Sequence, residues 1–125
     1  MINEAFGWLW VTVGFASGAA IGVRFHDPQW LGGYGALPRR LIRLGHISLI
    51  ALGALNILFA QSVDRLQTTG GEVATASWLF IFGAVAMPAC CALTAWRPGI
   101  KPLFIVPVVC LTAAGALAFY AMVRP

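Results

Sequence analysis

Hydrophobic residues fill this chain in long runs, and charged residues occur almost only between them. Four runs contain no charged residue, and they cover residues 5–23, 44–63, 73–96 and 102–123. A helix that crosses a membrane needs about 20 apolar residues, because the hydrocarbon core is about 30 Å thick. We therefore predict an all-α protein, with four transmembrane helices in an antiparallel bundle joined by short loops. The predicted spans are residues 6–23, 41–63, 73–96 and 102–123.

Composition supports this interpretation and bounds the architecture. Of 125 residues, 60% are hydrophobic and 10% are charged, whereas soluble domains carry roughly 25% charged residues. Four spans and their connections use the whole sequence, so we predict one domain over residues 1–125. The net charge of +4 is spread over helix ends, which does not indicate a nucleic-acid partner.

The positive charges predict an orientation. The connection between the first two spans contains four arginines, Arg24, Arg39, Arg40 and Arg43. The third connection adds Arg97 and Lys101, whereas the second has only Arg65, offset by two acids. By the positive-inside rule, loops 24–40 and 97–101 are cytoplasmic and both termini face the outer, periplasmic side. We expect an integral protein of the bacterial inner membrane.

Small residues and aromatic residues suggest contact surfaces. Gly14, Gly18 and Gly22 recur every fourth residue of the first span, a spacing that lets another helix approach closely in lipid. The loop after this span contains Trp30 and Tyr34 among glycines. It either simply joins two helices at the headgroup level or docks on a partner. We also expect Trp8 and Trp10 to anchor the outer end of the span at the membrane surface.

The second and third spans carry unusual polar and helix-breaking residues. Arg39, His46, Gly53 and Ala60 form one stripe of the second span, with Asn56 at its flank. This stripe should face the bundle interior, because lipid offers no hydrogen bonds. In the third span, Pro88 is predicted to remove a backbone hydrogen bond and to kink the helix.

His46 is the main candidate for chemistry, since apart from cysteine thiols it is the one ionisable side chain well inside a span. It could form a hydrogen bond that ties two helices, to a backbone carbonyl or to Ser or Thr. It could instead ligate haem b iron or a chlorin magnesium, or take part in proton or quinone chemistry. Arg43, one turn earlier, could anchor the boundary or pair with a haem propionate or a lipid phosphate. His26 could be a second haem ligand on the same membrane side, or an ordinary loop histidine.

Catalytic constellations are absent from the sequence, so we predict that the protein is not an enzyme. We expect an accessory or structural subunit of a larger membrane complex, respiratory or photosynthetic, that transfers electrons. It would pack through small-residue helix faces and the aromatic loop, with membrane lipids and other subunits as partners and with bound lipids. One alternative is a small haem- or pigment-binding redox protein that uses His46, and another is a small transporter or channel subunit.

Overall fold

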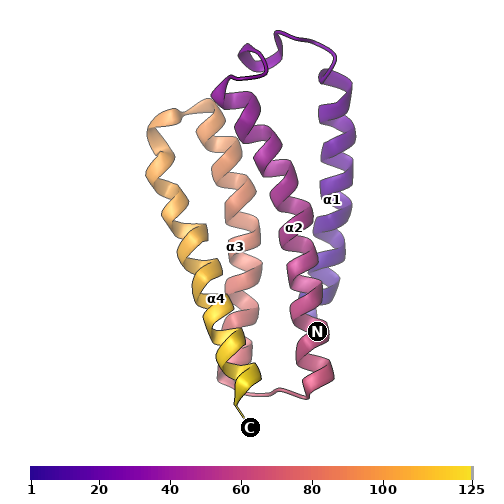
Figure 1. Cartoon of the computed structure of the whole chain (residues 1–125), viewed down its shortest axis with the longest axis vertical. Helices are drawn as coiled ribbons and strands as arrows, with labels where there is room; N and C mark the ends of the chain where they lie inside the picture. Colours follow the sequence, from indigo (N-terminus) through magenta and orange to yellow (C-terminus); the bar gives the residue numbers. More distant parts are fainter. Residues whose placement is uncertain (125) are drawn as a thin grey trace.

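The computed structural model describes residues 1–124, and all of its regular secondary structure is helical. It contains four α-helices, α1 (Ile2–Arg24), α2 (Leu37–Leu66), α3 (Gly71–Trp96) and α4 (Ile105–Val123). Consecutive helices run in opposite directions and lie side by side (Figure 1). All four are long and apolar enough to cross a membrane, which indicates a multi-pass integral membrane protein. The predicted four-helix antiparallel fold is confirmed.

The ends of the helices differ from the predicted spans. Helix α1 begins at Ile2 rather than near residue 6, which brings Asn3 into its first turn. The link between α3 and α4 is a 3₁₀ helix, η2 (Pro98–Phe104). Pro107 then falls in the first turn of α4, where its missing N–H would have no helical partner in any case. Another short 3₁₀ helix, η1 (Trp30–Gly32), interrupts the long connection between α1 and α2.

The helices pack in sequential order. Helix α1 packs against α2, α2 against α3, and α3 against α4, so α1 and α4 form the two edges of the bundle (Figure 1). A buried apolar cluster lies where α2, α3 and α4 meet. It includes Phe59 of α2 and Phe80 of α3, with ring centroids 5.0 Å apart. The stripe predicted on α2 faces inward: Arg39, Gly53 and Ala60 are buried, and His46 is half-buried.

Glycines bring α1 and α2 into backbone contact. A Cβ atom on Gly7 would lie 2.5 Å from the Gly53 carbonyl oxygen, and one on Gly53 would lie 2.8 Å from that of Gly7. A Cβ on Gly14 would collide with the side chain of Ile50. Gly22, in contrast, has nothing within 4 Å of its Cβ position and lies outside this contact. Close packing of this kind is a main source of helix association in lipid.

Pro88 lies inside α3, and the helix continues through it. Proline has no N–H to donate, so the carbonyl four residues earlier, that of Ala84, loses its helical partner. The indole Nε1–H of Trp10 donates to this carbonyl at 2.9 Å. Helix α1 therefore satisfies the backbone group that Pro88 frees in α3. The prediction that Trp10 anchors the membrane surface is wrong, because its indole N–H is used inside the bundle. Trp8 is 59% exposed, and its role as an anchor stays a prediction.

Candidate ligand site at His46

Buried polar side chains connect three helices at the end of the bundle where the N-terminus lies. Asn3 of α1 donates from Nδ2 to Asn56 Oδ1 of α2 at 2.8 Å and to the Ser77 carbonyl of α3 at 3.1 Å. The Ser77 hydroxyl donates back to Asn3 Oδ1. Asn56 uses its own amide to donate to Leu52 O at 2.8 Å. Because these side chains satisfy one another, this network is a structural tie and leaves no group for a ligand.

At the opposite end of the bundle, the Arg39 side chain is completely buried beneath the loop that joins α1 to α2. Its guanidinium carbon lies 4.5 Å from the ring centroid of Tyr34 and 5.6 Å from that of Trp30. The guanidinium also donates to three backbone carbonyls of the loop, those of Phe25, Asp27 and Pro28. Carbonyl dipoles and π faces thus surround the charge. Two rings of the predicted docking loop, Trp30 and Tyr34, accordingly hold the loop in place around Arg39.

His46 lies between these two ends and hydrogen-bonds to α1. Its Nδ1 is 3.0 Å from the Ser17 hydroxyl oxygen. That hydroxyl has a single hydrogen, which it donates to the Gly14 carbonyl at 2.8 Å, a group that can only accept. When the hydroxyl donates to Gly14, it accepts from Nδ1–H of His46, which is the tautomer that we assign to the ring. The interhelical tie is one of the roles expected for His46, and in this tautomer Nε2 keeps its lone pair.

Gly18 of α1 makes room for the imidazole. A Cβ atom at this position would lie 2.7 Å from His46 Cε1 and 3.2 Å from Nε2. The ring therefore rests directly on the backbone of α1. No group within residues 1–124 forms a hydrogen bond to Nε2.

A cavity of about 240 Å³ adjoins His46 between α1, α2 and α3. Its wall is mostly apolar, with Ile21 from α1, Ile42 and Leu49 from α2, and Ala92 from α3. Ser17 and His46 supply the polar groups. An apolar pocket with a few convergent polar groups is the usual form of a small-molecule site.

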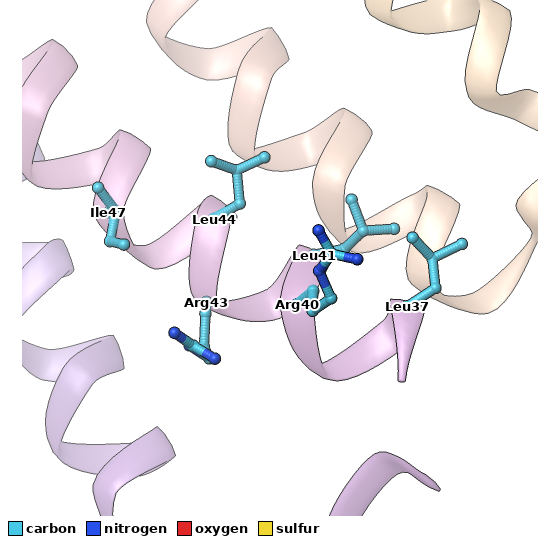
Figure 2. A pocket seen from close by; sticks show the side chains of 6 residues that line it. All are labelled: Leu37, Arg40, Leu41, Arg43, Leu44 and Ile47. Atoms are coloured by element: carbon cyan, nitrogen blue, oxygen red, sulfur yellow. The ribbon is translucent and has the colours of Figure 1, made fainter. Parts of the chain in front are cut away.

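The other predicted ligand residues lie elsewhere. His26 follows the end of α1 and is exposed, and neither it nor Arg43 lines the His46 cavity. Arg43 instead lies 5.5 Å from the Tyr34 ring centroid and lines a separate groove with Arg40 (Figure 2). Within residues 1–124, no group of three or more His, Cys, Asp or Glu side chains is placed to hold a metal ion.

Sequence reasoning missed two contacts around this site, Ser17 with His46 and Trp10 with Ala84. The first had a weak signal, since Ser17 precedes a glycine on the face predicted to pack. The second had a stronger one, because any proline inside a helix leaves the carbonyl four residues earlier without a partner.

No protein-family model, curated protein or solved structure matches this chain.

Proposed function

We propose that this protein is a small membrane subunit that binds the ring of a lipid-soluble quinol at His46. The observation that carries the proposal is that Nε2 of His46 has no hydrogen-bond partner within residues 1–124, on an imidazole that borders an apolar cavity. With the Nδ1–H donating to Ser17, Nε2 is the acceptor nitrogen of the ring. A quinol hydroxyl can donate to such a nitrogen, while its ring packs against the apolar wall.

Size and hydrogen-bonding capacity favour this ligand. The cavity, at about 240 Å³, is smaller than the roughly 300–1,000 Å³ of typical drug-sized sites. A single six-membered ring fits in a pocket of this size, whereas a tetrapyrrole would extend out of it. The oxidised quinone has only acceptor oxygens, and His46 in this tautomer offers it no donor. We therefore expect the quinol to bind more tightly than the quinone.

A quinol site is consistent with the expectation of an accessory subunit in an electron-transfer complex. In the proposed orientation within a bacterial inner membrane, loops 24–40 and 97–101 face the cytoplasm, because they carry most of the positive charge. Helices α1 and α4 each have one neighbouring helix with extensive contact. Their outer faces are thus available to lipid or to larger subunits. Co-purification with a stable complex after mild solubilisation tests this part, and a free, monodisperse protein counts against it.

Binding of a short-chain quinol to the purified full chain in nanodiscs tests the site directly. We expect His46→Leu to weaken quinol binding by about tenfold or more, as loss of one well-placed hydrogen bond in an apolar site does. The matched control is His26→Leu, which removes the exposed histidine and should leave affinity unchanged. Equal affinity of wild type and His46→Leu, or tighter binding of the quinone than of the quinol, refutes the proposal.

Metal ligation by His46 is the second candidate. The specific observation in its favour is the contact between Nδ1 and the Ser17 hydroxyl, because metal-binding histidines usually donate their other ring N–H to such a partner. Haem b or a chlorin would then lie largely outside the cavity, in lipid, with its metal on Nε2. An absorbance spectrum separates the candidates. A Soret band that disappears in His46→Leu supports a tetrapyrrole, and its absence under both oxidising and reducing conditions rejects one.

A further inference from the structure

A groove of about 370 Å³ runs along the first three turns of α2, separate from the His46 cavity. Figure 2 shows the six side chains that line it, all carried by α2. Two are arginines, and the other four are aliphatic. The lining residues are Leu37, Arg40, Leu41, Arg43, Leu44 and Ile47.

The two arginines of this groove have no acidic partner. Within residues 1–124, the one ion pair joins Arg124 to Glu72, at 3.9 Å. The loop above the groove carries Asp27, whose carboxylate accepts the backbone N–H of Gln29 at 2.9 Å. Arg40 and Arg43 lie three residues apart, so both side chains project from one side of the helix. They therefore form an uncompensated patch of two positive charges.

The position of Arg43 is partly fixed. Its guanidinium carbon lies 5.5 Å from the ring centroid of Tyr34, within the range of a cation–π contact. This contact holds Arg43 beside the loop, while Arg40 is exposed. Guanidinium groups of this kind bind phosphate oxygens in pairs of parallel hydrogen bonds.

Beyond the arginines the groove is apolar. Leu44 is 48% exposed and Ile47 is 56% exposed, and both lie further from the helix start than Arg40. A free phosphate ion would gain nothing from this apolar surface. A phospholipid has a phosphate for the arginines and an acyl chain for the apolar part of the groove. We propose that the groove binds an anionic glycerophospholipid. Its phosphate lies between Arg40 and Arg43, and an acyl chain lies along Leu44 and Ile47.

This site differs from a general attraction of arginines to the membrane surface. A boundary anchor would interact with many headgroups in turn and would show no saturation. A pair of guanidinium groups beside an apolar groove, one of them held by Tyr34, should instead select one lipid with a net negative headgroup.

The test is a titration of phosphatidylglycerol or phosphatidylcholine into the detergent-purified full chain, followed by native mass spectrometry. We expect saturable binding of phosphatidylglycerol in preference to phosphatidylcholine. The double variant Arg40→Gln with Arg43→Gln should bind phosphatidylglycerol about 30-fold more weakly, because each arginine near a membrane surface contributes about 1 kcal/mol. Arg40→Lys with Arg43→Lys keeps the charges and should retain more affinity than the glutamine pair.

The matched control removes two charges from the same membrane side, outside the groove. Arg97→Gln with Lys101→Gln should keep the affinity of the wild type, and both residues are exposed. Equal losses in the control pair and in the groove pair would overturn the proposal, as would equal binding of the two lipids. Displacement of the lipid by millimolar inorganic phosphate would also overturn it, because the site would then bind the ion alone. Helical circular dichroism of each variant verifies its fold.

Discussion

Gly18→Ala provides the sharpest test of the contact between α1 and His46. The new Cβ would lie 2.7 Å from His46 Cε1, whereas carbon atoms in contact stay about 3.5 Å or more apart. The ring would have to move by about 0.8 Å, the difference between these two distances. A movement of this size is large for the 3.0 Å contact between Nδ1 and Ser17. We therefore expect the interhelical hydrogen bond to break.

Three contributions set the size of the effect. Loss of an interhelical hydrogen bond in a membrane costs about 0.6 kcal/mol on average. Overpacking of a tight contact costs about 1–3 kcal/mol. Replacement of glycine by alanine in a helix returns up to about 1 kcal/mol. The matched control is Gly22→Ala, which gains the same helix propensity but meets nothing within 4 Å. Gly18→Ala should therefore be less stable than Gly22→Ala by about 1.5 kcal/mol or more.

The assay is equilibrium unfolding in mixed micelles with increasing sodium dodecyl sulfate, followed by circular dichroism. Wild type, Gly18→Ala and Gly22→Ala are compared at the same lipid and detergent ratio. Equal free energies of unfolding for the two alanine variants would refute the placement of His46 against Gly18. Quinol affinity gives a second readout, since the displaced ring should bind less tightly in Gly18→Ala alone.

Two further predictions concern the other polar contacts. Trp10→Phe should reduce the free energy of unfolding in the same assay by about 0.6–1.7 kcal/mol, because the carbonyl freed by Pro88 loses its donor. In a Pro88→Ala background the loss should shrink, since residue 88 then supplies its own N–H, and an undiminished loss would contradict this account. Arg39→Gln should destabilise the protein by about 3 kcal/mol, because the buried guanidinium donates charge-assisted hydrogen bonds to the loop. Faster amide hydrogen exchange in residues 25–36 would accompany this change, whereas Arg40→Gln should leave exchange there unaltered.

Sequence reasoning predicted the four helices because charge spacing in a membrane protein is set by bilayer thickness. It placed the ends of the helices less well. A polar residue can lie within a membrane helix when groups on other helices form hydrogen bonds with its side chain, and the sequence does not show those bonds. Asn3 shows this plainly. In the sequence, Asn3 lies before the predicted start of the first span. In the structure, its amide donates hydrogen bonds to Asn56 and Ser77 inside the bundle.

The candidate site could be predicted only in part. Depth in a span singled out His46, and four-residue spacing pointed to Gly14 and Gly18, which pack on α2, but also to Gly22, which does not. Which ring nitrogen stays free could not be predicted, because it depends on where the Ser17 hydroxyl donates its hydrogen. The burial of Arg39 could not be predicted either. Arg40 and Arg43 lie near it on α2, yet Arg39 is the arginine that is buried under the aromatic loop.

The Asn3 contacts constrain the order in which the protein can be completed during biosynthesis. Asn3 and Ser77 are 74 residues apart, so α1 leaves the ribosome well before α3 has been made. Until then, the Asn3 amide can bond with Asn56 but lacks its second acceptor. A hairpin of α1 and α2 without α3 would therefore present a polar edge at Asn3. The arrival of α3 in the membrane is the step at which Asn3 gains both of its acceptors.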